Sequence, residues 1–389
     1  MKIIATVAEY NPFHLGHVKH IDYMKNTLKA DRLIVVMSGN FTQRGEPAVL
    51  DKFTRAKHAV IAGADLVIEL PTVFAVSNAE IFAKGACGII NSLGVADSLC
   101  FGVESGLKED YLSLAAAMND ESRDFKRVLK DCLSDGVSLA KAKFLALKLL
   151  GKSFDEALIG SPNNILALEY TKSLLSLKSD IQIEPMKRDG DHNDIKLKKG
   201  ITSASSIREV IRLNKLRRLK KNLPPYVYGD LKIFPEVFDK MVMSALYTSS
   251  ASELGEIYDC TEGLENRIKA FSKDNYDVQS LVEKVSTKRY TKARIRRILI
   301  DNLLGVKRAL VDASLSGGLY AKVLAVNSEC KDVISLVAKH SSIPVLTRKS
   351  DLAELNRRAT AAFEKDVLAN DLYNMATGSR TNENGMIMI

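Results

Sequence analysis

The chain opens with Ile3-Ile4-Ala5-Thr6-Val7-Ala8-Glu9-Tyr10-Asn11-Pro12-Phe13-His14-Leu15-Gly16-His17, an apolar run followed by two histidines three residues apart. Residues 3–8 are typical of a strand buried on both faces, as parallel sheets require. A turn through Asn11-Pro12 follows, and apolar residues at helical spacing begin just after Gly16. The two histidines therefore lie where a strand's carboxyl end meets a helix's amino end. Open α/β sheets bind phosphate groups at such places, so the stretch predicts nucleotide chemistry.

Three further apolar runs follow at residues 33–37, 66–70 and 99–103, with helical patterns between them. Short buried strands that alternate with helices indicate a parallel, right-handed sheet. The predicted fold class is α/β, a doubly wound, Rossmann-like sheet whose strand ends all face one edge.

The rest of the chain is mostly helical in pattern. We expect a catalytic domain over residues 1–213 that contains a helical insertion at about 107–178, with a last strand at 181–185 and a helix opening at 202–208. Residues 214–389 are expected to form a basic, mostly helical domain, with strand candidates at 320–326 and 343–346. The polar tail at 379–384 is expected to fray.

Bulk composition excludes several classes of protein. Hydrophobic residues make up 46% and charged residues 26% of 389 residues, which is typical of a soluble protein. The five cysteines never occur at C-x-x-C spacing, so neither a disulfide framework nor a zinc site is expected. No apolar run is long enough to span a bilayer, and residues 10–17 are too polar for a signal peptide. We therefore expect a cytoplasmic protein that does not associate with a membrane. We also expect no obligatory protein partner and no dedicated cluster of carboxylates for binding a metal.

The net charge of +9 is unevenly distributed. Residues 1–214 carry +2 and residues 215–389 carry +7. Two basic runs lie in the second part, at 215–221 and at 288–297, and the latter holds six cations and one aromatic residue, Tyr290, in ten positions. Solvated helix faces often look like this, but two such runs beside a nucleotide-using half favour binding to RNA phosphates. Tyr290 is a candidate for stacking on an unpaired base.

His14-Leu15-Gly16-His17 resembles the HxGH signature of the nucleotidyltransferase superfamily, which cleaves ATP between its α and β phosphates. The longer match, over residues 7–17, resembles the opening of the bacterial tRNA(Met) cytidine acetate ligases. That similarity continues, in the same order, through residues 37–48, 65–71, 162–166, 203–208 and 287–291. Blocks spread from residue 7 to about residue 297 make the resemblance specific, whereas HxGH alone would not.

The resemblance implies a two-step reaction. Acetate attacks the α-phosphate of ATP, which releases pyrophosphate and leaves acetyl-adenylate. The wobble cytidine of elongator tRNA(Met) then takes the acetyl group on its exocyclic amine, giving N4-acetylcytidine in the anticodon region. Acetate is ionised at neutral pH, so the first step needs charge neutralisation and in-line placement rather than a general base.

The resemblance also implies which residues bind the nucleotide. His14 and His17 would be catalytic, donating hydrogen bonds to phosphate oxygens, and Gly16 would let the backbone approach the nucleotide. The whole ATP-binding set would be Val7, Ala8, Glu9, Tyr10, Asn11, Pro12, Phe13, His14, Leu15, Gly16, His17, Val18, Lys19, His20, Gly102, Asn163, Asn164, Arg188, Ser205, Ser206 and Arg208. Either Asn163 or Asn164 would bond the nucleoside, although helix capping is an alternative for both. Mg²⁺ is expected to accompany ATP.

A second set of residues is predicted to contact the tRNA. Arg44 lies in a loop after a strand and is assigned to the acceptor or the tRNA. The others are Lys52 and Arg55, assigned to phosphate or the tRNA backbone, and Lys288, Arg289, Tyr290, Arg294, Arg296 and Arg297. Ordinary surface charge is the rival interpretation for the cations, and a buried side chain is the rival for Tyr290.

Other functions share some of these features. A small-molecule adenylyltransferase acting on a phosphate-bearing cofactor precursor would use the same histidines, but it would not need a basic second half. A class I aminoacyl-tRNA synthetase would carry a lysine-rich second signature, for which no match is found. A catalytically silent RNA-binding protein would have no use for intact His14, His17 and Arg208.

Overall fold

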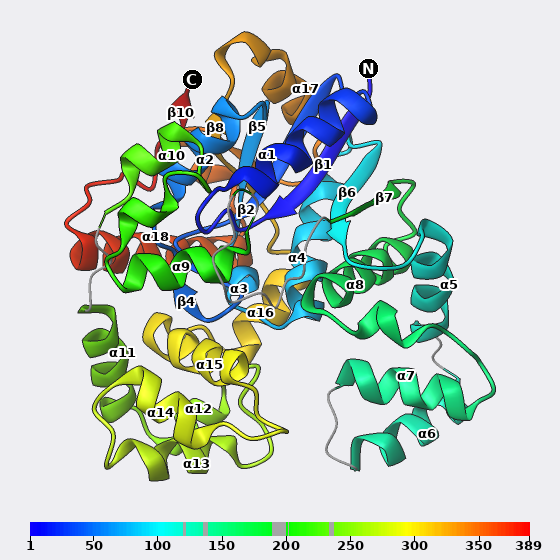
Figure 1. Cartoon of the computed structure of the whole chain (residues 1–389), viewed down its shortest axis with the longest axis vertical. Coiled ribbons are helices and arrows are strands. Elements are labelled where there is room, and N and C mark those ends of the chain that lie inside the picture. The colour runs from blue at the N-terminus through cyan, green and yellow to red at the C-terminus, as the bar shows by residue number, and fades with distance from the viewer. Residues whose placement is uncertain (120–121, 135–138, 189–199, 201, 233–236) are drawn as a thin grey trace.

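The computed structural model describes residues 1–119, 122–134, 139–188, 200, 202–232 and 237–389. Within them one eight-stranded sheet forms the centre of the molecule (Figure 1). Seven strands follow one another across it: β10 (Ile387–Met388), β8 (Ala321–Val326), β5 (Leu66–Leu70), β2 (Arg32–Ser38), β1 (Ile3–Ala8), β6 (Ser98–Val103) and β7 (Gln182–Lys187). The short strand β9 (Val345–Leu346) pairs with β8.

The strands from β5 to β7 are parallel, which confirms the predicted doubly wound sheet. The chain builds outward from β1 through β2 to β5, and then returns to the other side of β1 to build β6 and β7. The order therefore reverses between β1 and β6. Such a switch point opens a crevice at the carboxyl ends of the strands, where doubly wound folds bind their ligands.

Alternate residues of the strands face opposite sides of the sheet, as the apolar runs predicted. In β2, Ile34 and Val36 belong to one hydrophobic cluster, while Leu33, Val35 and Met37 belong to the other. In the first cluster, one face of the sheet packs against helices that include α3 (Thr72–Ala75), α4 (Ala79–Ser92), α8 (Pro162–Ser176) and α18 (Arg357–Thr377). In the second cluster, the other face packs against α1 (Leu15–Asp22), α2 (Lys52–Ile61), α9 (Ala204–Arg212) and α10 (Pro225–Asp230). Both faces of the parallel sheet are therefore covered.

Two helical regions extend from the sheet toward the bottom of Figure 1. One is the expected insertion, with α5 (Lys108–Met118), α6 (Arg123–Ser134) and α7 (Leu139–Leu149) leading into α8. The other, which we call the helical lobe, comprises α11 (Val237–Thr248), α12 (Ala251–Gly255), α13 (Leu264–Ser272), α14 (Val278–Val285), α15 (Lys292–Leu304) and α16 (Arg308–Leu315). After the lobe the chain forms β8, then α17 (Asp332–His340), β9, α18 and β10.

The prediction of a separate second domain from residue 214 onward is wrong. β8 pairs antiparallel with β5, and β10 pairs with β8, so the end of the chain completes the sheet that its start began. Residues 320–326 and 343–346 were expected to contain strands, and both do. The partner of β8 in the sheet, β5, lies more than 250 residues earlier and cannot be read from local pattern. The helical lobe is thus inserted between two parts of one sheet-centred unit.

The polar tail is also ordered, contrary to the expected fraying. Glu383 is 5% exposed and lies against the buried amino groups of Lys52 and Lys322. Its ion pairs hold the tail to the sheet.

Candidate functional site

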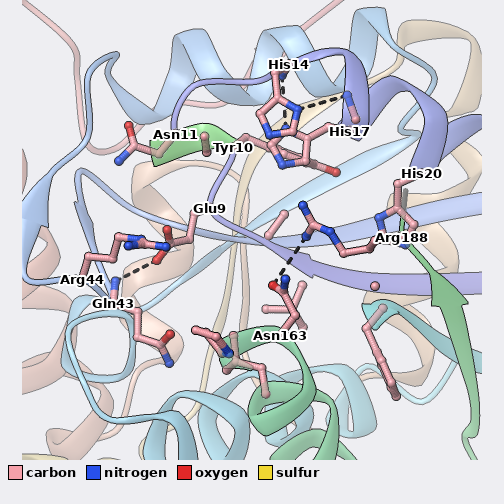
Figure 2. Close-up of a pocket in the computed structure, with 18 of the residues that line it drawn as sticks. Glu9, Tyr10, Asn11, His14, His17, His20, Gln43, Arg44, Asn163 and Arg188 are labelled. Carbon is pink, nitrogen blue, oxygen red and sulfur yellow. Dashed lines mark hydrogen bonds between the residues drawn. The ribbon is translucent and has the colours of Figure 1, made fainter. Parts of the chain in front are cut away.

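A cavity of about 370 Å³ lies at the switch point of the sheet. The carboxyl ends of β1, β6 and β7 contribute Val7, Ala8, Phe101, Gly102 and Met186 to its wall. The amino ends of α1, α8 and α9 also reach it, so three helix N-termini face a common space. Figure 2 shows the polar side chains converging there. This geometry favours a bound anion.

His14 and His17 lie in this cavity and hold each other in place. His14 is the residue that caps the N-terminus of α1, and its Nδ1 accepts the backbone N–H of Gly16 at 3.0 Å. The Nδ1 of His17 accepts the backbone N–H of His14 at 3.2 Å. The two rings stack with centroids 3.7 Å apart. Sequence alone predicted the pair, and the structure adds their mutual orientation.

These hydrogen bonds determine what the imidazoles can offer a ligand. Burial lowers the pKa of His14 to about 3, with Arg188 and Arg208 as further causes. Burial also lowers the pKa of His17 well below its ordinary value, and the neighbouring His14 adds to this. Both rings are therefore neutral at physiological pH. Because each Nδ1 is an acceptor, the proton of each ring is on Nε2, which leaves two N–H donors for the cavity.

Asn163, the candidate for binding the nucleoside, and Arg188 lie close together in the cavity (Figure 2). Asn163 donates to the carboxylate of Glu104 at 2.9 Å, and Arg188 Nη1 lies 3.5 Å from the Asn163 side-chain oxygen. A Cβ on Gly102 would stand 2.9 Å from the Arg188 side chain, so the glycine makes room for this arginine. His20 also lines the cavity, and burial, followed by Arg188, lowers its pKa to about 4.

The structure distinguishes between Asn163 and Asn164. Asn164 is 1% exposed, accepts the backbone N–H of Glu104 and donates to Ser105 Oγ and the Ala157 carbonyl. It therefore fixes the loop beneath the site, while Asn163 lines the cavity.

Ser205, Ser206 and Arg208 at the start of α9 were all expected to bind ATP, but only Arg208 lines the cavity. Ser203 caps the helix by accepting the backbone N–H of Ser206, and the hydroxyls of these two serines are 2.8 Å apart and buried. Arg208 lines the cavity, donates to the Asn11 carbonyl at 2.9 Å and bonds Ser205 Oγ at 3.3 Å. Burial lowers its pKa only to about 10, so it remains charged. The structure places Ser205 and Ser206 outside the cavity lining.

Not every residue of the expected 7–20 loop reaches the cavity. Glu9, Tyr10, Asn11, Gly16 and Lys19 do. Phe13 is fully buried in the core, and Pro12, Leu15 and Val18 are likewise absent from the lining.

Two predicted tRNA contacts are wrong because the side chains are buried. Lys52 is 1% exposed and its amino group lies 2.8 Å from Glu69 and 2.6 Å from Glu383. Arg55 is fully buried and donates to the backbone carbonyls of Glu9, Ser38, Gly39 and Leu50. Neither can touch a tRNA.

The basic run before and within α15 divides into an outer and an inner part. Lys288 and Arg289 are exposed, and Arg289 pairs with Glu262. Tyr290 is half-buried, and its hydroxyl donates to the Glu262 carbonyl. Arg294, Arg296 and Arg297 instead turn inward.

The inner arginines join the helical lobe to the sheet. Arg296 pairs with Glu46 at 3.0 Å, in the hairpin of β3 (Phe41–Thr42) and β4 (Glu46–Pro47). Arg297 pairs with Asp259 at 2.7 Å, donates to the Gln43 carbonyl and lines the cavity together with Ala293. Both side chains thus make contacts within the protein, and Arg297 is open to the cavity rather than to an outer surface.

Sequence reasoning missed the apolar floor of the cavity, which consists of Phe82, Phe101, Leu166, Tyr170 and Met186. In sequence these residues cannot be distinguished from core positions of a strand or helix. Arg44 and Gln43 line the cavity as well. Throughout the described residues, no three His, Cys, Asp or Glu side chains gather closely enough to hold a metal ion.

The chain is similar to known proteins over nearly its whole length. Residues 1–386 match the family described as HIGH Nucleotidyl Transferase. The chain is 38% identical over 387 residues to the tRNA(Met) cytidine acetate ligase of Thermoanaerobacter sp. (strain X514), covering 97% of this chain and 96% of the relative. It is also 38% identical over 394 residues to the enzyme of that name from Clostridium perfringens, with the same two coverages.

Solved structures are similar over the whole length. The chain resembles Thermotoga maritima TmcAL bound with alpha-thio ATP, with a TM-score of 0.91, 30% identity and full coverage of both chains. For the apo form of that protein the TM-score is 0.93.

Proposed function

Because this chain belongs to the tRNA(Met) cytidine acetate ligase family of HIGH nucleotidyl transferases, we propose that the cavity at its switch point activates acetate with ATP. The protein is an ATP-dependent ligase that modifies tRNA. The observation that carries the assignment of the cavity is the pair of neutral imidazoles, each with an Nε2–H available at the start of α1.

In the first step an acetate oxygen attacks the α-phosphorus of ATP, and the bond to the bridging oxygen breaks as pyrophosphate leaves. His14 and His17 donate their Nε2–H groups to phosphate oxygens on which negative charge builds. Arg188 and Arg208 neutralise the triphosphate from two sides of the cavity. No proton moves, which suits a site whose histidines are held neutral.

Asn163 holds the nucleoside half of ATP, and the apolar floor around Phe101 and Tyr170 provides a surface for the adenine ring. Mg²⁺ arrives with ATP, bound to the phosphates as part of the substrate, as is usual for this ion. We assign no protein ligand to it.

In the second step the acetyl group passes to the N4 amine of the wobble cytidine of elongator tRNA(Met). The lobe face around Lys288 and Arg289 contacts the tRNA backbone, since both side chains are exposed and α15, which they precede, reaches the cavity wall. The basic run at 215–221 adds exposed cations, namely Lys215, Arg217, Arg218, Lys220 and Lys221. In the described residues no helix is both long and apolar enough to cross a membrane. We expect the enzyme to act in the cytoplasm, where its tRNA substrate is found.

The test is incubation of the full chain with labelled acetate, ATP and total bacterial tRNA, followed by nucleoside analysis. We expect label in N4-acetylcytidine that depends on ATP. Label that is absent from cytidine, with adenylyl transfer to a phosphate-bearing small molecule instead, would overturn the proposal.

A further inference from the structure

The cavity has a second end, to which the proposed function assigns no part of the nucleotide. Glu9, Gln43 and Arg44 lie together there, away from Asn163 and Arg188 (Figure 2). Arg297 of the helical lobe also lines the cavity, and it donates to the Gln43 carbonyl. This end is therefore built from the first strand's loop, the β3–β4 hairpin and α15 together.

Glu9 differs in charge from every other ionised group on the cavity wall. Among the described lining residues it is the one carboxylate, whereas the cations are Lys19, Arg44, Arg188, Arg208 and Arg297. The resemblance placed Glu9 in the ATP-binding loop, but a carboxylate repels the phosphates of ATP, so its negative charge suits a different partner.

The position of Glu9 is well defined. Its backbone carbonyl accepts Arg55 Nη1 at 2.6 Å, and its side-chain Oε1 accepts the backbone N–H of Gln43 at 2.9 Å. A carboxylate has about four acceptor sites, so this one bond leaves capacity for a further proton donor. The carboxylate is thus held at one place and still able to act on a substrate.

Acetyl transfer requires a proton acceptor. The cytidine amine forms a bond to the acetyl carbon, the bond between that carbon and the phosphate oxygen breaks, and AMP leaves with the electron pair. The amine nitrogen must lose one proton to become an amide. The imidazoles of His14 and His17 are unsuited to take it, because each Nδ1 already accepts a backbone N–H and each Nε2 carries a proton.

We propose that Glu9 accepts this proton, and that the cavity end formed by Glu9, Gln43, Arg44 and Arg297 binds the amine-bearing base. Glu9 is then a catalytic residue of the second step alone, and it releases the proton to solvent after transfer. This inference rests on the proposed function, since it needs an acetyl-adenylate and an amine acceptor.

The test compares both half-reactions in full-length variants. Glu9→Gln keeps an oxygen for the Gln43 N–H but cannot act as a base. We expect its acetate-dependent ATP–pyrophosphate exchange to match wild type, while single-turnover transfer from chemically prepared acetyl-adenylate to tRNA(Met) slows by about 10²–10⁴-fold. In Glu9→Ala, added formate should restore part of the transfer rate, because a small carboxylate can occupy the vacated space. A role limited to holding the hairpin would not respond to formate. Glu256→Gln, which alters an exposed ion pair with Lys307, serves as the matched control and should transfer normally.

Transfer at the wild-type rate by Glu9→Gln would overturn the inference. A parallel loss of exchange and transfer would do so as well, because Glu9 would then serve the nucleotide. Absence of acetate-dependent exchange in the wild-type protein would instead overturn the proposed function itself.

Discussion

At the scale of single residues, the chemistry of His14 and His17 depends on the backbone groups around them as well as on their positions in the sequence. The spacing of the two histidines was visible in sequence, and their location between β1 and α1 was predicted correctly. Their tautomer was not predictable, because it follows from two backbone hydrogen bonds to Nδ1 that only the folded loop creates.

The imidazole donors can be tested with variants of His17 that separate the roles of its two ring nitrogens. His17→Asn keeps an acceptor near the position of Nδ1 and removes the Nε2–H group, whereas His17→Ala removes both. We expect each variant to lose about 10²–10³-fold in acetate-dependent pyrophosphate exchange, the loss typical of removing one such donor. Filter binding of tRNA should be unchanged. Full exchange activity in His17→Asn would mean that the Nε2–H group is not used.

The depressed pKa of His14 predicts a pH dependence of stability. Its pKa is about 3 in the folded protein and 6.5 as an ordinary histidine. Between these values the unfolded chain binds a proton that the folded protein does not, so stability falls as the pH drops through this window. His14→Asn retains an acceptor for Gly16 and cannot titrate. We expect wild type to lose about 2 kcal/mol more than this variant between pH 7 and pH 5 in urea unfolding. Parallel losses would show that His14 titrates normally.

Charged residues were the least predictable at this scale. Lys52 and Arg55 look like surface cations in sequence, because nothing local reveals that Glu69, Glu383 and several carbonyls surround them. Arg297 was predicted to contact the tRNA from a basic surface, and the structure places it on the cavity wall, paired with Asp259.

At the scale of elements, the strands of the parallel sheet were predicted within one or two residues because each is a short apolar run bounded by turns. The contact between the β3–β4 hairpin and α15 was not predicted. It joins segments about 250 residues apart and depends on Glu46, Arg296 and a close backbone approach at Gly45.

Gly45 provides a test of that contact. It has a φ of +70°, and a Cβ there would stand 2.3 Å from the backbone nitrogen of Arg297. Gly263 has a φ of +77° with nothing within 4 Å of a Cβ, so Gly263→Ala is a control for backbone strain alone. We expect Gly45→Ala to lower Tm more than Gly263→Ala, and to impair acetyl transfer, because α15 must move away from the hairpin. Equal shifts in Tm and unimpaired transfer would show that the lobe does not need this contact.

At the scale of the whole molecule, the end of the chain completes the sheet begun by its start. Lys52, Glu69, Lys322 and Glu383 form a buried ionic cluster that joins α2, β5, β8 and the tail. Each residue is at most 5% exposed. The expected boundary near Leu213 failed because strand pairing between β5 and β8 leaves no local trace in the sequence.

Removing one member of this cluster should be costly. Glu383→Ala leaves the charges of Lys52 and Lys322 with Glu69 alone, and breaking a buried pair in this way destabilises a protein by about 3–5 kcal/mol. The exposed Glu329→Ala is the control and should be close to neutral. Chemical unfolding measures both. If Glu383→Ala lowers the free energy of unfolding only slightly, the tail is mobile and the ionic cluster does not depend on Glu383.

The central claim is that ATP binds at the switch point with its phosphates on the imidazoles of His14 and His17. The most direct measurement is a crystal structure of this chain with a nonhydrolysable ATP analogue. We predict the α-phosphate within hydrogen-bond distance of at least one Nε2, the ribose near Asn163 and the guanidinium groups of Arg188 and Arg208 beside the triphosphate. Adenine bound elsewhere, or an empty cavity at saturating analogue, would contradict it.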